Sequence, residues 1–349
     1  MKKTATFISI FVLAFLFVGV VILGSQPVYA KAKVLRLVVP TPPGDWPLTF
    51  MNEEFARKFN ERVKGKEYVM EVHAGGALAK LPEYFDAVRI GAVEMACAPW
   101  GMFSFLDPRL GIKETPFLFV SSSAASYATK PLLPLYDQIL QKKFNAKGLS
   151  MMNTGGIHLF STKPVKTLED WKGLLTGAIS PPAAALIKEL GGSPVTIMFM
   201  DMYESLQKKV IDATTQGTHG ALVLGMTEVC KNATIFLGIA GWNGFSINLD
   251  IWKKMPKHIQ QILQEEATAA AEFMNTTVDT KLGEDDLKAY KKNNVEVYIV
   301  PKAERDRWEE KLAPYRDKHI ASFGEFGQKV MKIVNEANKR HPYTERGMY

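Results

Sequence analysis

Cysteine is scarce in this chain: there are two among 349 residues, Cys97 and Cys230. Two cysteines so far apart exclude a small fold held together by disulfides, and they provide no C-x-x-C pair for a metal or redox centre. We expect both to be buried and to act as small apolar side chains. Stability must then come from a hydrophobic core, and 47% apolar against 23% charged residues suits a folded soluble protein.

The usual signatures of catalysis and metal binding are also missing. The chain has no G-x-S-x-G, no H-E-x-x-H and no phosphate loop ending in Gly-Lys-Ser/Thr. Its histidines are far apart and form no ligand-spaced pair; they are His73, His158, His219, His258, His319 and His341. We therefore expect no cofactor and no metal, and we favour a binding protein over an enzyme. A catalytic triad assembled in space from distant residues stays open as an alternative.

Clusters of one charge sign are lacking as well. The formal net charge is +7, but acidic residues alternate with basic ones along the chain. A nucleic-acid-binding surface requires a basic stripe or patch. We expect no nucleic-acid partner and interpret the charge as an ordinary solvated surface.

Long apolar runs are limited to one, at residues 7–23. Lys2 and Lys3 precede it, and the small residue Ala30 ends a segment of the kind that signal peptidase cleaves. A run of this length is also just enough for a membrane anchor, which is the alternative. We expect a signal peptide over 1–30, export to the periplasm, and a mature chain of 319 residues that does not itself span the membrane.

Beyond the apolar run, strand-like and helical patterns alternate. Residues 34–40, 68–74 and 93–98 are short apolar runs typical of buried strands. Between them, apolar residues recur with helical spacing over 48–63 and 81–88. A β-α-β-α-β order of this kind predicts a mostly parallel sheet with right-handed connections.

The same order returns after Gly155 and Gly156. Thr167 and Asp170 have the spacing of a capping box, which predicts a short helical turn. Strands are predicted at 158–162, 174–180, 195–198 and 211–215, and helices at 181–190 and 201–210. Two such sets in one chain predict two α/β lobes.

A further strand and a long helix follow. Apolar residues alternate over 245–251, as in a half-buried strand, and a helical pattern then runs from 259 to 282. A helix of this length is expected to cross both lobes and to limit them to hinge motion.

Several segments resemble those of one family. Residues 163–173, KPVKTLEDWKG, are similar to the "KPVKTxEDLKG" segment of TRAP-transporter solute-binding proteins, the DctP-like family. Other segments resemble the family's "GGQLG", "AVRxGAIDMA", "LPFLF", "LGGxPV" and "YEALQxGVIDG" in the same order; they are 75–78, 87–96, 115–119, 190–195 and 203–212. The resemblance covers nearly the whole mature chain.

The resemblance implies a two-lobed clamshell of the periplasmic-binding-protein type. Each lobe is then a mixed, mostly parallel sheet flanked by helices, with hinge strands and a long helix spanning both. We place the first lobe at 31–153 and 243–290, and the second at 154–242 and 291–349. The family also implies capture of a small organic acid and its delivery to the membrane permease subunits of a transporter, with no chemistry done on the ligand.

The arginine with which the family clamps a ligand carboxylate is missing. Where the family has Ile-Arg-Val after "DLKGLK", this chain has Thr176, Gly177 and Ala178, so Gly177 takes the position of the arginine. Its loss removes the strongest and most specific anchor for a carboxylate. Gln216 stands where the family has an asparagine that meets the ligand, and its longer amide keeps a hydrogen-bonding group there.

Three tryptophans are candidates for contact with the ligand. Trp46 follows the loop after the first strand, Trp100 lies just past the third strand, and Trp242 precedes the strand at 245–251. Parallel sheets present ligand crevices at such positions, although any one of these residues could instead belong to the core. Together with the missing arginine they predict a less charged, bulkier or aromatic ligand, bound by stacking and amide hydrogen bonds.

Three smaller candidates complete the predicted site. His158 begins the strand that enters the second lobe, where it is either a hydrogen-bonding or titratable ligand contact or a polar group satisfied within the fold. Thr176 and Ser180 belong to the wall by alignment with the family.

Two other functions stay open. An exported α/β enzyme would show turnover in a catalytic screen. A binding protein that serves a sensor would be encoded beside a kinase instead of beside two membrane subunits.

Overall fold

The computed structural model describes residues 32–43, 47–64 and 67–349. The predicted signal peptide and Trp46 lie outside these ranges. Within them the strands form one nine-stranded sheet in the spatial order β2-β1-β3-β8-β4-β7-β5-β6, with β9 paired to β8. The strands are β1 (Lys33–Val39), β2 (Tyr68–Ala74), β3 (Met95–Ala98), β4 (Ala146–Ser161), β5 (Leu175–Ala178), β6 (Ser193–Thr196), β7 (Ala213–Gly217), β8 (Asn232–Asn248) and β9 (Glu296–Ile299).

Two long strands divide this sheet into lobes. β4 and β8 pair with each other antiparallel over most of their length. At one end β1 pairs parallel with β2 and β3, and at the other β5 pairs parallel with β6 and β7. Each group is a small parallel sheet. Within the sheet, only β4 and β8 connect the two groups. This arrangement confirms the predicted two-lobed α/β fold with hinge strands.

The crossing strands are irregular where they pass between the lobes. Their pairing shifts register between Asn153 and Gly155 and again between Ile157 and Leu159. Gly155 has a φ of 100°, and a Cβ at Gly241 would lie 3.0 Å from the carbonyl oxygen of Gly155. Glycine is required at both positions because a side chain would strain the backbone or meet it. The bulges therefore lie at the expected hinge.

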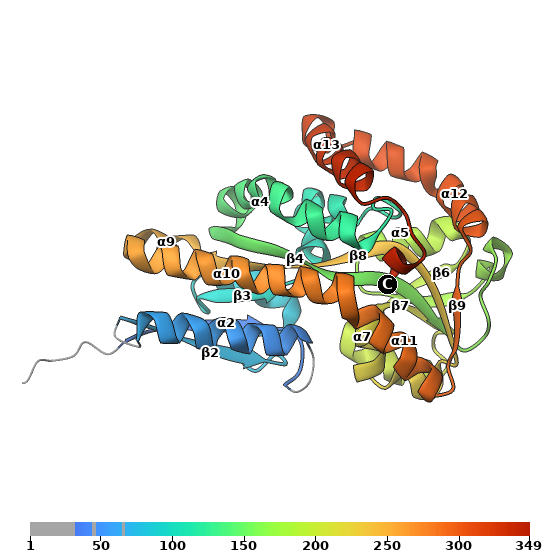
Figure 1. Cartoon of the computed structure of the whole chain (residues 1–349), viewed down its shortest axis with the longest axis horizontal. Helices are drawn as coiled ribbons and strands as arrows, with labels where there is room; N and C mark the ends of the chain where they lie inside the picture. The colour runs from blue at the N-terminus through green and yellow to red at the C-terminus, as the bar shows by residue number, and fades with distance from the viewer. Residues whose placement is uncertain (1–31, 44–46, 65–66) are drawn as a thin grey trace, which may run out of the picture.

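Helices cover both faces of the sheet (Figure 1). The α-helices are α2 (Pro47–Val63), α3 (Tyr84–Arg89), α4 (Ser122–Phe144), α5 (Pro181–Leu190), α6 (Met202–Gln207), α7 (Thr218–Val223), α8 (Met226–Val229), α9 (Leu249–Lys254), α10 (Lys257–Thr277), α11 (Gly283–Lys292), α12 (Lys302–Ala321) and α13 (Gly324–Arg340). Short 3₁₀ turns are η1 (Leu81–Glu83), η2 (Trp100–Phe105), η3 (Pro108–Glu114), η4 (Leu168–Trp171), η5 (Phe199–Asp201) and η7 (Arg346–Met348). The predicted capping box is present at the start of η4.

The long helix predicted to brace both lobes is α10 together with its continuation. α10 runs along the first lobe and leads into α11 beside the second (Figure 1). The two are joined without a break by η6 (Val278–Leu282), which is π-helical. A π segment is an uncommon interruption of an α-helix and is often found at functional positions. Here it coincides with the passage between the lobes.

Each lobe has a hydrophobic core on either face of the sheet. In the first lobe, α2 and α10 cover one core and α4 covers the other, where Val330 and Val334 of α13 also pack. In the second lobe, Leu287 and Tyr290 of α11 share a core with α6, α7 and α8, and α5 and α12 cover the opposite face. By packing, therefore, α13 belongs with the first lobe and α11 with the second. The lobe boundaries given from the sequence remain a prediction.

Cys97 and Cys230 are buried and form no disulfide, which confirms the expectation for both. Among the helices of the described ranges, none is long and apolar enough to cross a membrane.

Candidate ligand-binding site

A cleft of about 170 Å³ lies between the two lobes. Its walls come from the ends of the parallel strands: Thr41 follows β1, Pro99 follows β3, Ser180 follows β5 and Met198 follows β6. The crossing strands contribute Thr154, Ile157, Ile239, Ala240, Gly241, Trp242 and Asn243, and the bracing helix contributes Met274 and Leu282. Ligands of α/β folds bind at the carboxyl ends of parallel strands. The lining thus joins both lobes and the hinge in one site.

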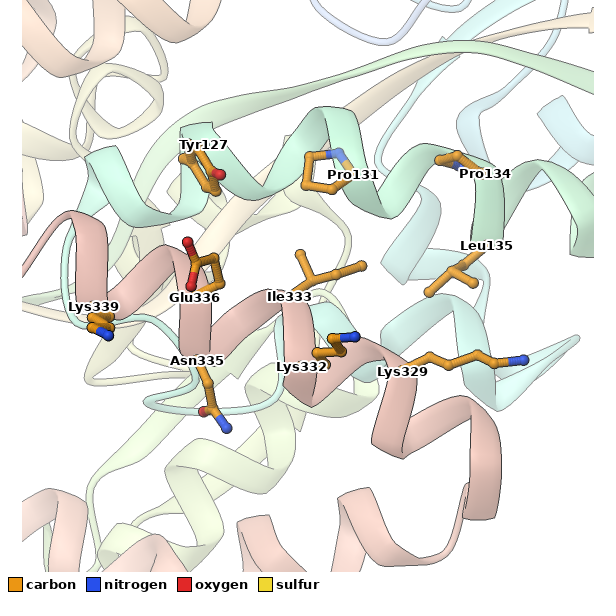
Figure 2. A pocket seen from close by; sticks show the side chains of 10 residues that line it. All are labelled: Tyr127, Pro131, Pro134, Leu135, Lys329, Lys332, Ile333, Asn335, Glu336 and Lys339. Atoms are coloured by element: carbon orange, nitrogen blue, oxygen red, sulfur yellow. The ribbon is translucent and has the colours of Figure 1, made fainter.

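A larger groove, of about 720 Å³, lies on the outside of the first lobe between α4 and α13. Figure 2 shows Glu336 and Ile333 of α13 pointing toward Tyr127 and Pro131 of α4. None of its lining residues carries a buried polar atom without a partner, whereas the interlobe cleft has several. Because a specific ligand must satisfy such atoms, we take the smaller cleft as the candidate site.

Three of the predicted residues line this cleft: Ser180, Gln216 and Trp242. The hydroxyl oxygen of Ser180 accepts the N–H of Ala183 at 3.4 Å and thereby caps α5. The Gln216 Oε1 accepts the N–H of Gly217 at 3.2 Å, while its Nε2 is buried without a partner. The Nε1 of Trp242 is likewise buried and unpartnered. Gln216 and Trp242, which both line the cleft, therefore each hold a buried hydrogen-bond donor without a partner.

Trp100 and His158 are buried away from the lining. Trp100 stacks on Tyr136, with ring centroids 6.3 Å apart. The Nδ1 of His158 accepts the backbone N–H groups of Phe236 and Leu237, each at 3.2 Å. Burial lowers the pKa of His158 to about 3, so the ring is neutral at physiological pH and does not supply the positive charge that was one of its predicted roles. Direct contact of either residue with a ligand stays a prediction.

Thr176 and Gly177 lie on β5, also off the lining. The hydroxyl of Thr176 donates to the carbonyl oxygen of Leu174 at 3.2 Å. A Cβ at Gly177 would lie 3.0 Å from Ile211 Cδ1 and 3.6 Å from Met202 Cε. The space next to position 177 is therefore filled by Ile211 and Met202 of the second lobe's core and by the hydroxyl of Thr214, whose Oγ1 would lie 3.6 Å from the Cβ.

An arginine at position 177, introduced by Gly177→Arg, is expected to lower the free energy of unfolding by at least the roughly 1–3 kcal/mol that overpacking a core costs, because its charge would also be buried without a partner. It is not expected to create an acid clamp, because Ile211 and Met202 occupy the space that the side chain needs. Urea unfolding and calorimetric titration with succinate check both statements. Leu175→Arg, at an exposed position of the same strand, is the matched control. Tight succinate binding by a stable Gly177→Arg variant would contradict this account.

Sequence reasoning missed several polar residues of the cleft, and two of them bear most on the ligand. Asn243 has a buried Oδ1 without a partner, and Glu114 presents a carboxylate. The Nζ of Lys113 lies 3.0 Å from Glu114 Oε1. Burial lowers the pKa of Lys113, although the negative charge of Glu114 and its hydrogen bond act in the opposite direction. A Lys-Glu dipeptide beside a Pro-Phe segment has no pattern that would have separated it from a surface pair.

Groups that could hold a metal were not found: within the described ranges no three His, Cys, Asp or Glu side chains converge. The arrangement at the cleft instead suits the binding of a small solute. It can enclose a small solute between two hinged walls and satisfy it through amide, indole and carboxylate groups.

The fold and the cleft define a two-lobed solute-binding protein. The chain belongs to the DctP family, "bacterial extracellular solute-binding protein, family 7", whose profile matches residues 41–322. The members of this family are solute-binding proteins.

Curated relatives support this assignment. The C4-dicarboxylate-binding periplasmic protein DctP of Rhodobacter capsulatus is 26% identical over 312 residues, which cover 86% of this chain and 90% of that protein. The C4-dicarboxylate-binding protein DctB of Bacillus subtilis is 25% identical over 280 residues, 78% of each chain.

Solved structures share the fold. DctP7 of Bordetella pertussis, a solute receptor that binds pyroglutamic acid, has a TM-score of 0.82 at 19% identity, covering 87% of this chain and all of that one. A TRAP solute-binding protein of Desulfovibrio salexigens with bound orotic acid has a TM-score of 0.78 at 20% identity, covering 88% and 99%. Both confirm the two-lobed architecture.

Proposed function

We propose that this protein is the periplasmic solute-binding subunit of a TRAP-type secondary transporter. It captures a small organic solute, of the organic-acid class but held without the family's arginine clamp, and delivers it to the membrane permease subunits. The observation that carries the proposal is the cleft itself. It is lined from both lobes and the hinge, and it holds unused buried donors on Gln216 and Trp242.

Capture follows from the hinge. A ligand that touches both walls binds the closed state more tightly than the open state, so it shifts the population toward closure. We expect the backbone to bend at the bulges between β4 and β8 and at the π segment η6, where regular pairing and regular helix geometry are already interrupted. The closed form is then the species that a permease distinguishes from the empty carrier.

Export is part of the same proposal. The sequence expectation of a signal peptide over 1–30 suits a carrier that works outside the cytoplasmic membrane, as the R. capsulatus relative, a periplasmic protein, does. N-terminal sequencing of protein recovered from the periplasm checks it: the mature chain is expected to begin at Lys31, and an intact N-terminus would contradict it.

A melting-temperature screen of organic acids, their amides and neutral solutes tests solute capture, since a ligand that binds only the folded state must raise its stability. Uptake of the best ligand into vesicles that contain the permease, with and without this protein, tests delivery. Uptake that does not depend on the protein would contradict the transport role and leave binding intact.

Gln216→Ala is expected to weaken binding of the ligand found in that screen by roughly three- to tenfold, the value of one hydrogen bond. The change removes the Nε2 donor. Because Oε1 also accepts the N–H of Gly217 and the residue is 4% exposed, the melting temperature of the ligand-free protein should fall as well, so affinity is compared at a temperature where both variants are folded. Calorimetric titration measures the affinity. Gln141→Ala, at an exposed site on α4, is the matched control, and equal affinities of the two variants would remove Gln216 from the site.

A further inference from the structure

Glu114 presents the one carboxylate among the described residues that line the cleft. It stands at the end of η3, and its side chain is 10% exposed. Its Oε1 receives the Nζ of Lys113 at 3.0 Å. Its Oε2 has no hydrogen-bond partner among the described residues and so retains its full capacity to accept.

The carboxylate of Glu114 occupies the space that a side chain at position 101 would need, because residue 101 is a glycine. A Cβ at Gly101 would lie between 1.9 and 2.1 Å from the carboxylate atoms of Glu114. The carboxylate therefore lies directly against the backbone of η2, and any residue other than glycine at position 101 would displace it. Because two separate turns meet to fix one carboxylate at the cleft, its position is a built feature of the site.

The cation of the pair is buried and is not among the residues that line the cleft. Lys113 is 1% exposed, does not line the cleft, and places its Nζ 5.5 Å from the ring centre of Tyr136 and 5.7 Å from that of Trp242. Cation–π contacts of this kind stabilise a buried ammonium. The pair thus shows its negative end to the solute and keeps its positive end behind the wall.

This polarity is the opposite of what a dicarboxylate needs. No lysine or arginine is present among the described lining residues, and Gly177 stands where the family's clamp would be. A second ligand carboxylate would enter the cleft beside Glu114 with no lysine or arginine in the lining to pair with it. The imidazole of His219, which also lines the cleft, already has Asp286 Oδ1 2.9 Å from its Nδ1. A carboxylate buried there without a counter-ion is costly. A hydroxyl or N–H group would instead satisfy Glu114 Oε2.

We infer that Glu114 selects the solute: it accepts a hydrogen bond from a hydroxyl or amide N–H, so the ligand is a hydroxy- or amide-bearing organic molecule with at most one carboxylate. The inference rests on the proposed function, because it concerns the ligand of the same cleft. The volume of about 170 Å³ is below the roughly 300–1,000 Å³ of drug-sized sites and limits the solute to a small one. Sites built to bond a donor discriminate strongly against analogues that lack it.

Isosteric series test the ligand class. Succinamide, succinamate and succinate have the same length but carry zero, one and two carboxylates, and the glutaric and aspartic series extend the set. Melting shifts and calorimetric titration should rank the amide-bearing members above the diacid in each series, by roughly tenfold or more in affinity. A diacid that binds most tightly would overturn the inference and leave solute capture standing. No response to any member, or to the wider solute screen, would overturn both.

Variants test the residue. Glu114→Gln alone would leave Lys113 buried without its counter-ion, so the pair is replaced together by Lys113→Met with Glu114→Leu, a change that buried pairs often tolerate. This variant should lose the preference for amides over diacids while it remains folded. Gly101→Ala, which displaces the carboxylate without removing the charge, should weaken amide binding in the same direction. Glu310→Gln, at an exposed site on α12, is the control. An unchanged ranking in both cleft variants would remove Glu114 from selection.

Discussion

His158→Ala is expected to lower the free energy of unfolding by roughly 2–6 kcal/mol at neutral pH. The Nδ1 of His158 accepts two backbone N–H groups, those of Phe236 and Leu237. These lie where β8 departs from regular pairing, and Leu237 has a φ of 48°. Without the ring both donors are buried and unpaired, at about 1–3 kcal/mol each. Urea unfolding followed by circular dichroism measures the loss.

In the wild-type protein, His158 should also make the stability depend on pH in the acid range. Burial lowers the pKa of His158 to about 3, whereas in the unfolded chain it is near 6.5. Above pH 6.5 the ring is neutral in both states and contributes no slope. Between pH 6.5 and 3 the unfolded chain binds a proton that the folded protein does not, so stability falls as the pH falls, by up to about 1.4 kcal/mol per pH unit.

A matched variant separates the hydrogen bonds of His158 from its titration. The Oδ1 of asparagine lies close to the position of Nδ1 but does not titrate, so His158→Asn should retain much of the stability at neutral pH and flatten the slope between pH 6.5 and 4. The exposed His258 provides the control variant His258→Asn. A slope that is unchanged in His158→Asn, or a neutral-pH stability that His158→Ala does not alter, would show that the ring is not what supports the bulge.

Local patterns predicted most of the regular elements. The predicted strand at 68–74 is β2, residue for residue, and the predicted helix at 181–190 is α5, which Ser180 caps and Gly191 ends. These elements carry their signals in their own residues, as apolar periodicity and as capping groups. Tertiary packing did not change these elements.

Where tertiary packing decides, the sequence was a poor guide. α4 contains Pro131 and Pro134, which normally argue against a helix interior, yet its Leu132, Tyr136 and Ile139 are buried against the sheet and α13. β4 contains Gly148, Gly155 and Gly156, residues that are more typical of a loop. It is a strand because β8 pairs with it on one side.

The candidate site divides in the same way. Ser180 and Gln216 could be found because they stand at or just after strand ends, which topology brings together. Glu114 could not, since its place at the cleft depends on a glycine thirteen residues earlier that lies against it only in the folded chain. Trp100 also follows a strand, but its ring turns inward, and that difference leads to a measurable consequence.

Trp100→Ala is expected to cost roughly 3–5 kcal/mol of stability, as for other large aromatic residues removed from a core. The indole is 1% exposed and lies against the backbone of both crossing strands, where glycine makes room for it. A Cβ at Gly244 would be 2.4 Å from its Cζ2, and one at Gly148 would be 3.2 Å from its Cη2. Trp100 therefore fills space that the hinge strands leave open.

A double-mutant cycle distinguishes this role from ligand binding. Gly244→Ala alone should destabilise the protein, because its methyl group overlaps the indole. In the Trp100→Ala background the same methyl group enters the cavity left by the ring, so its cost should shrink or reverse, and the two changes should be strongly non-additive. The folded Trp100→Ala protein, studied at low temperature, should keep its affinity for the ligand within a few-fold, whereas a ligand-stacking residue would lose it. Additive changes in stability together with lost affinity would show that Trp100 contacts the ligand. The expected result shows instead that Trp100 stabilises the packing of the hinge strands.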